Sequence, residues 1–126
     1  MARIRTMKPE FWGSGDIAPR LSRDARLLVL GLISMADDDG RFLASPNAII
    51  GYVFPNDENV TAAQVRKWLT EASERCEPVY LYEVDGVRYG CFPKWHKHQV
   101  VNRHTPSKLP APDIECVRRS SSKGVE

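Results

Sequence analysis

The sequence lacks a long apolar run, a cysteine framework and a strong excess of one charge. Its longest apolar stretch, residues 27–33, is far shorter than the roughly 20 residues that a membrane-spanning helix requires. The basic start of the chain is not followed by an apolar segment of signal-peptide length. We therefore expect a protein without a membrane partner that stays in the cytoplasm of the cell that makes it.

Cysteine is also too scarce to organise the fold. Cys76, Cys91 and Cys116 are an odd number with wide spacing, which favours reduced thiols over disulfides. Cys91 and the histidines at 96, 98 and 104 match no familiar zinc-finger spacing, and no nucleophile, base and orienting group can be assembled. The sequence predicts no metal, no other cofactor and no enzymatic activity.

Charge is nearly balanced in total but not along the chain. The net charge is +2, from 18 Lys and Arg against 16 Asp and Glu. Residues 1–26 carry a net +3, residues 27–93 a net −5 and residues 94–126 a net +4. The small total therefore conceals two basic ends, so that it does not count against a nucleic-acid partner.

The first strong element is a helix that begins after Ser22, a favourable N-cap, and ends near Ala36. Apolar residues surround it almost completely, which is typical of a buried central helix. Residues 37–40, Asp-Asp-Asp-Gly, predict a turn and not a calcium loop, because the first and twelfth ligand positions would fall on Met35 and Pro46. A short strand is expected at 41–44.

Two more helices carry clear start signals. Ser45-Pro46 places a cap and a first-turn proline before a helix that ends at Pro55. Residues 61–64, Thr-Ala-Ala-Gln, form a capping box for a third helix that runs to about Glu74. Its expected buried side chains, with Trp68 beside them, are Ala62, Val65, Leu69 and Ala72.

Two β-rich runs, 79–84 and 87–92, flank Asp85-Gly86, a pair that favours the positive φ angles of a type I′ hairpin turn. The order of elements predicts an α+β fold, a winged helix-turn-helix with a three-helix core and a C-terminal β-hairpin wing. In such folds the last helix enters the major groove and the wing lies over the backbone or the minor groove.

The expected domain boundaries follow from these elements and from composition. The winged-helix domain should span 22–99, preceded by a basic N-terminal arm at 1–21. A basic extension rich in Pro and Ser should follow at 100–126 and be partly disordered.

Four stretches carry a family resemblance: residues 1–12, which are the most specific, and residues 25–28, 36–41 and 92–99. Over about residues 1–112 the chain resembles a bacteriophage and prophage family of small helix-turn-helix proteins. That family is similar to the N-terminal winged-helix domains of phage replication-initiation proteins, or replisome organisers. The resemblance implies binding of double-stranded DNA during replication initiation or its regulation in the host cell. The resemblance also implies host or phage replication proteins as partners, and it is compatible with a homodimer.

Residue chemistry indicates where DNA would bind. Arginine and lysine contact phosphates or guanine, glutamine can pair with adenine, and basic arms enter minor grooves. The expected DNA-binding residues are Arg3, Arg5 and Lys8 in the arm, Gln64, Arg66, Lys67 and Thr70 on the third helix, Arg88 past the wing tip, and Lys94, Lys97, His98, Arg103 and Lys108 toward the C-terminus.

Other interpretations remain open. Arg66 and Lys67 lie close in sequence to Glu71 and Glu74, so they also fit an ordinary solvated helix face. The acidic middle suits a protein-interaction module that docks a basic host or replisome protein without contacting DNA. A third hypothesis is single-strand binding through the region of Trp95. The tryptophans at 12, 68 and 95 are nevertheless expected to pack in the core.

Overall fold

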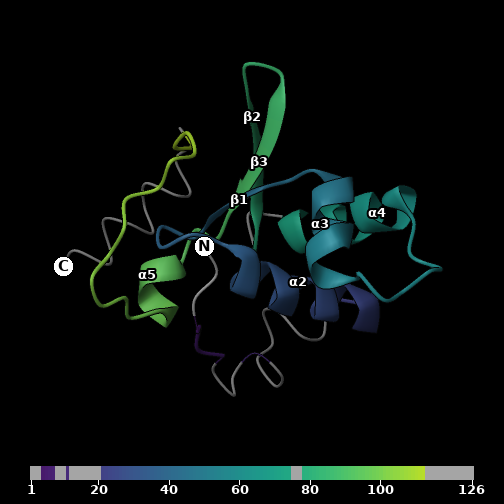
Figure 1. The fold of residues 1–126 in the computed structure, drawn as a ribbon, viewed down its shortest axis with the longest axis horizontal. Helices are drawn as coiled ribbons and strands as arrows, with labels where there is room; N and C mark the ends of the chain where they lie inside the picture. Colours follow the sequence, from purple (N-terminus) through teal and green to yellow (C-terminus); the bar gives the residue numbers. More distant parts are fainter. Residues whose placement is uncertain (1–3, 8–10, 12–20, 75–77, 113–126) are drawn as a thin grey trace.

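The structure is a computed structural model, and it describes residues 4–7, 11, 21–74 and 78–112. These residues form an α+β fold in which three helices pack together beside a small antiparallel sheet and a short fourth helix lies on the other side (Figure 1). The elements are α2 (Arg23–Met35), β1 (Arg41–Leu43), α3 (Pro46–Val53), α4 (Ala62–Ser73), β2 (Tyr80–Val84), β3 (Val87–Cys91) and α5 (Trp95–His98).

Helix α2 packs against the other two long helices, as predicted for a central helix, but it is not buried all round, because Leu27 is 52% exposed. The Ser22 hydroxyl accepts a hydrogen bond from the Ala25 N–H, which confirms the expected cap. One face of the helix is fully buried, and both α3 and α4 pack against it. The buried side chains of α2 are Ala25, Leu28, Val29 and Leu32.

The caps of α3 and α4 are also as predicted. The Ser45 hydroxyl accepts from the Ala48 N–H, and Thr61 and Gln64 form both hydrogen bonds of the capping box. Trp68 is buried and packs on Phe54, with 5.6 Å between ring centroids. The other buried side chains of α4 are Val65, Leu69 and Ala72, whereas Ala62 of the expected stripe is only half-buried.

The sheet has the strand order β1-β3-β2, and all its pairs are antiparallel. Asp85 and Gly86 have φ angles of 52° and 78°, so that the predicted type I′ turn is confirmed. The hairpin projects beyond the helices, and β1 pairs only with its base (Figure 1). Phe42 fills the space beside Gly90 on the face toward the core, and three tyrosines stack on the other face.

The two ends of the described chain are part of the domain, which differs from the expected arm and extension. Phe11 and Leu21 belong to the hydrophobic core, and residues 100–112 run back along the body of the fold (Figure 1). Helix α5 is an additional element, and its Trp95 is buried against Phe92. The compact unit therefore reaches beyond the predicted limits of 22–99.

Gly40 lies in the turn between α2 and β1 and packs against Trp95 of α5. It has a φ of 77°, and a Cβ built there would lie 2.6 Å from Trp95 Cγ. Gly86 has almost the same φ, but a Cβ there would meet nothing within 4 Å. Substituting each glycine in turn therefore separates the cost of backbone strain, which both share, from the cost of overpacking, which only Gly40 has.

We expect Gly40→Ala to lower the free energy of unfolding by about 3 kcal/mol, from backbone strain plus overpacking against Trp95. Gly86→Ala, the matched control, should lose only about 1 kcal/mol. Urea denaturation followed by tryptophan fluorescence measures both values, and equal losses would contradict the packing role of Gly40.

Candidate nucleic-acid interface

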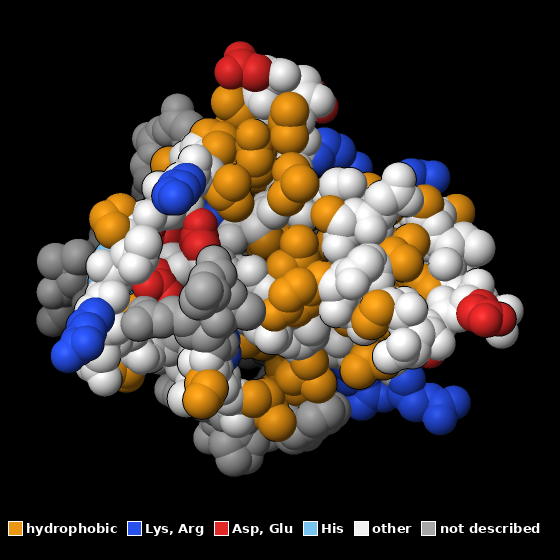
Figure 2. Space-filling view, in the orientation of Figure 1, with side chains coloured by type: hydrophobic (Ala, Val, Ile, Leu, Met, Phe, Trp, Pro, Cys, Tyr) orange, Lys and Arg blue, Asp and Glu red, His pale blue; other side chains and the backbone are white. Residues whose placement is uncertain are grey.

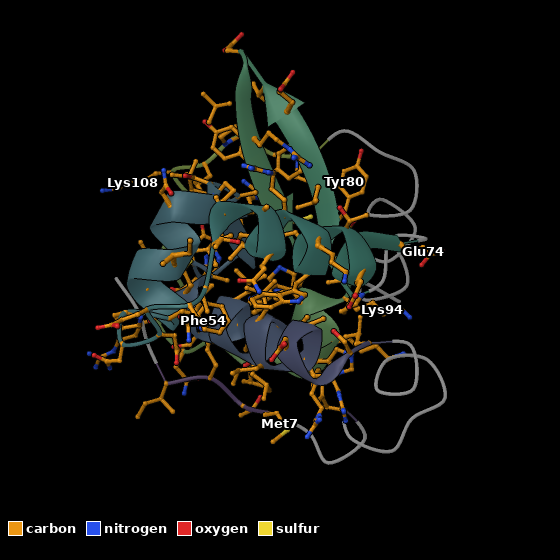
Figure 3. All side chains as sticks on the ribbon, turned by 90° about the vertical axis from the view of Figure 1, so that its right-hand side faces the viewer. Met7, Phe54, Glu74, Tyr80, Lys94 and Lys108 are labelled. Carbon is orange, nitrogen blue, oxygen red and sulfur yellow. The ribbon has the colours of Figure 1, made fainter. Side chains whose placement is uncertain are left out.

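Helix α4 presents an exposed face opposite its buried one. Gln64, Arg66, Lys67 and Thr70 are all exposed on it, as the sequence predicts. Figure 3 shows α4 lying across the molecule beneath the projecting hairpin, with Glu74 near its C-terminal end. The structure therefore brings these four predicted residues together on one helix beside the hairpin.

Two of these four side chains already have partners within the helix. The Gln64 amide oxygen accepts a hydrogen bond from the Thr61 N–H at 2.9 Å. Bidentate recognition of adenine needs that oxygen, so the capping box competes with the predicted base contact. The Thr70 hydroxyl donates to the Arg66 carbonyl at 2.9 Å. Gln64 therefore caps the helix that carries the cations, whereas the Thr70 hydroxyl is occupied by its bond to the helix backbone.

Arg66 and Lys67 remain as unneutralised cations. Within the part of the chain that the structure describes, neither forms an ion pair. Glu71, one helical turn after Lys67, instead accepts a hydrogen bond from the Ser22 hydroxyl at 2.9 Å. This contact joins α4 to the start of α2. The Lys67–Glu71 pair of an ordinary solvated helix face is therefore not formed.

The hairpin carries one basic residue of the predicted set. Arg88 is exposed and lies opposite Glu83 in the strand register. The tip itself is acidic, because the exposed Asp85 occupies the turn; acidic side chains crown the hairpin in Figure 2. Arg88, set back from the tip, is thus the hairpin residue suited to a phosphate, whereas Asp85 would be repelled.

The predicted C-terminal basic residues lie elsewhere. Lys94, Lys97, His98, Arg103 and Lys108 are exposed. However, α5 and the segment that follows it are at the opposite end of the molecule from α4 (Figure 1). Lys94 and Lys108 also lie on opposite sides of the view in Figure 3. The structure does not gather these residues with α4 into one basic surface.

Arg5 does not belong to a free arm, which corrects the prediction for that residue. Its side chain is 6% exposed and pairs with Asp38 at 2.9 Å. It also donates to the Ala36 carbonyl and lies 5.0 Å from the Trp95 ring centroid. Arg5 is thus committed to the interior. Arg3 and Lys8, the other predicted arm residues, lie outside the described residues.

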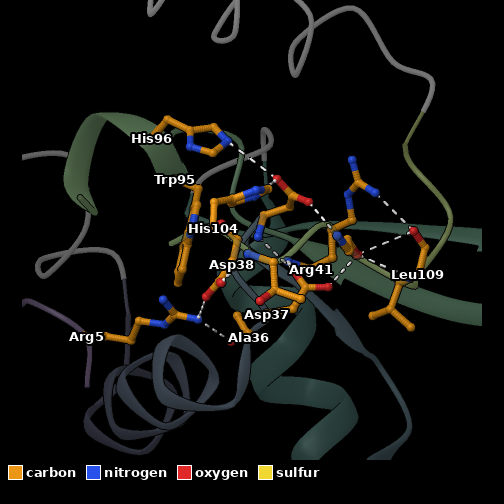
Figure 4. A network of polar contacts seen from close by, with 12 residues as sticks. Arg5, Ala36, Asp37, Asp38, Arg41, Trp95, His96, His104 and Leu109 are labelled. Atoms are coloured by element: carbon orange, nitrogen blue, oxygen red, sulfur yellow. Dashed lines mark hydrogen bonds and ion pairs between the residues drawn. The ribbon is translucent and has the colours of Figure 1, made fainter. Parts of the chain in front are cut away.

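The partner of Arg5 is part of a larger network that sequence reasoning missed. We call Asp37, Asp38 and Asp39 the acidic turn. Figure 4 shows Arg5 approaching this turn from one side and Leu109 of the C-terminal segment near Arg41 on the other. The sequence feature that could have indicated this network is the run of three consecutive carboxylates in a chain with two basic ends.

Residues 104–107 bind the acidic turn from the C-terminal side. The Thr105 N–H donates to Asp38 and the Ser107 N–H to Asp39, at 2.9 and 2.8 Å. The Ser107 hydroxyl donates to Asp37, and His104 Nε2 lies 2.8 Å from Asp39 Oδ1. Each carboxylate of the turn therefore has a partner from the end of the described chain.

The environment of Asp39 alters its pKa. Burial by itself raises the pKa of this carboxyl. Hydrogen bonds from the Ser107 N–H and from His104, with the nearby charges of His104 and Arg41, outweigh burial and hold the pKa below its usual 3.8. The charged form of Asp39 is therefore favoured in the folded protein.

Trp95 is not available to stack on a base. Its side chain is 3% exposed, and its indole N–H donates to the Asp38 carbonyl at 2.9 Å. This confirms its expected place in the core, as for Trp68, whereas Trp12 lies outside the described residues. Single-strand binding through Trp95 is thus contradicted, since stacking needs an exposed ring.

The described residues contain neither a candidate metal site nor a candidate membrane-spanning helix. Among them, no group of three His, Cys, Asp or Glu side chains could hold a metal ion. The Cys91 side chain is buried and is not part of a disulfide. None of the helices in the described ranges is both long and apolar enough to cross a membrane.

Comparison with known proteins adds no relative to this description. No family model, no curated protein and no solved structure matches the chain.

Arg5→Ala should lower the free energy of unfolding by about 3 kcal/mol, because it leaves the Asp38 carboxylate buried without its cation. Lys108→Ala removes an exposed basic side chain and should change stability by less than about 0.5 kcal/mol. Chemical denaturation of both variants at neutral pH checks this. Similar values for the two would contradict the structural role of Arg5.

The acidic turn also predicts how stability depends on pH. Because the pKa of Asp39 is lowered on folding, its contribution is present above pH 3.8 and is lost as pH falls through the folded-state pKa. Asp39→Asn should therefore lose stability at neutral pH and approach the parent protein in acid. Asp57→Asn, at an exposed loop position, is the control. A parent-minus-variant difference that stays constant across denaturation curves from pH 7 to acid would count against this role.

Proposed function

We propose that this chain is a winged-helix protein that binds double-stranded DNA, with α4 as the recognition helix. The observation that carries the proposal is the pair of exposed cations on α4, Arg66 and Lys67, neither of which forms an ion pair with another described residue. The acidic residue that would neutralise Lys67 is instead held by Ser22.

The architecture supports this assignment. Helices α2, α3 and α4 pack on one another, and the β2–β3 hairpin follows α4, as in a helix-turn-helix with a wing. An α-helix with its side chains is about 10–12 Å wide, which fits a major groove of about 12 Å. The buried face of α4 anchors it, so that its outer face can enter the groove without disturbing the core.

The contacts can be assigned by position. Arg66 and Lys67 would reach phosphates or guanine edges from α4, and Arg88 would contact the backbone from the hairpin. Gln64 supports the helix through its capping box, which occupies the amide oxygen that a bidentate contact with adenine would use. The exposed cations of residues 94–108 would add only general electrostatic attraction from the other end of the molecule.

The biological context comes from the resemblance of residues 1–12 and the later matching stretches to phage replication-initiation proteins. On that basis we place the DNA binding in replication initiation or its regulation, in the cytoplasm of the host. Host or phage replication proteins are the further partners that this assignment implies.

Arg66→Ala together with Lys67→Ala should weaken binding to a fluorescein-labelled duplex of mixed sequence by about tenfold or more. Anisotropy titrations between about 50 and 200 mM salt give the affinity and its salt dependence. The slope of log affinity against log salt should fall by about 0.9 for each phosphate contact that is lost.

The matched control is Arg103→Ala together with Lys108→Ala, which removes the same charge at the far end of the molecule. A smaller loss than for the α4 pair supports recognition by α4, whereas equal losses would mean that only net charge matters. If the parent protein does not bind duplex DNA, the protein-interaction module becomes the better hypothesis.

A further inference from the structure

An apolar patch covers the face of α2 that points away from the hairpin. We define the α2 patch by Ile4, Met7, Leu27, Leu30 and Ile33. Ile4, Leu27 and Met7 are 100%, 52% and 43% exposed. Figure 3 shows Met7 below α2, on the far side of α2 from α4 and the hairpin.

The patch is hollowed between the N-terminal segment and the helix. A cleft of about 460 Å³ is lined by residues 4–7 and by Leu30, Ile33 and Ser34 of α2. Among the described residues that line the cleft, Arg5 is the only charged one, and its side chain is buried in its pair with Asp38. The described lining is therefore mainly apolar, with Thr6 and Ser34 as its uncharged polar residues.

The exposed face of α2 that carries the patch has different charges at its two ends. Arg23, Leu27, Leu30 and Ser34 follow one another at intervals of four, three and four residues, so that they share one face of α2. Arg23 is exposed at the N-terminal end, where a cation opposes the helix dipole. The last turn of α2 contains no basic residue.

The exposed face of α2 is complementary to the same face of a second α2 that runs in the opposite direction. Two copies of α2 packed antiparallel about a two-fold axis would place leucines against leucines at the centre. Each Arg23 would then lie near the C-terminal end of the other α2, where a cation is favoured. Among the described residues of the cleft, none presents an exposed charge to its own copy across the axis.

We infer that the α2 patch is the interface of a homodimer, in which α2 packs antiparallel on α2 of a second copy. A patch this apolar is typical of a protein contact and not of a nucleic-acid contact. The arrangement leaves α4 and the hairpin free on the opposite side. It holds whether or not α4 binds DNA.

Sedimentation equilibrium on the full chain tests the inference. The parent protein should be a dimer at micromolar concentration, and Leu27→Glu should weaken dimerisation by about 100-fold, since it places two carboxylates near the axis. Val87→Glu is the control, because Val87 is 40% exposed on the hairpin and should leave the dimer intact. A monomeric parent, or equal behaviour of the two variants, would overturn the inference.

Arg23→Glu gives a second test in which unfolding cannot imitate the effect. A glutamate at the start of α2 favours the helix within one copy but removes the attraction to the partner helix. Dimerisation should weaken about 3- to 30-fold, because each dimer holds two such contacts. An unchanged dimer would contradict the antiparallel arrangement. Duplex-DNA titration of the same variants distinguishes failure of the dimer from failure of DNA binding.

Discussion

Three consecutive carboxylates at the end of α2 are the constraint on which much of this structure depends. They repel one another and lie at the negative end of the helix dipole, while the last turn of α2 supplies no cation. Arg5 compensates from the N-terminal segment by binding both Asp38 and the Ala36 carbonyl. Residues 104–107 bind the second oxygen of Asp37, that of Asp38 and both oxygens of Asp39. The first oxygen of Asp37 accepts from the N–H groups of Asp39 and Arg41 within the turn.

This arrangement explains the uneven charge of the sequence. Part of the acidic excess of residues 27–93 is neutralised by Arg5 and hydrogen-bonded by the C-terminal segment, so opposite charges cancel where the ends meet the turn. Gly40 and Trp95 pack beside the same turn, which makes it the junction of α2, β1 and α5. Arg66 and Lys67 stand outside this network, and neither forms an ion pair with another residue that the structure describes.

Local features were predictable because they depend on neighbours in sequence. The caps at Ser22, Ser45 and Thr61 and the turn at Asp85-Gly86 each arise from a few adjacent residues, and all four were predicted correctly. The exposed face of α4 followed from helical periodicity in the same way. By contrast, α5 has no cap or apolar stripe, and it depends on Trp95 reaching the Asp38 carbonyl.

The sequence by itself determined helices α2, α3 and α4, the hairpin and the exposed cations of α4, because periodicity and capping act over a few residues. Only the tertiary structure decided which charges are available. In the folded protein, Arg5 is buried against Asp38, Glu71 binds Ser22 and not Lys67, and residues 94–108 lie at the other end of the molecule from α4. Contacts between residues more than 30 positions apart are set by the packing of the whole chain, and no local pattern encodes them.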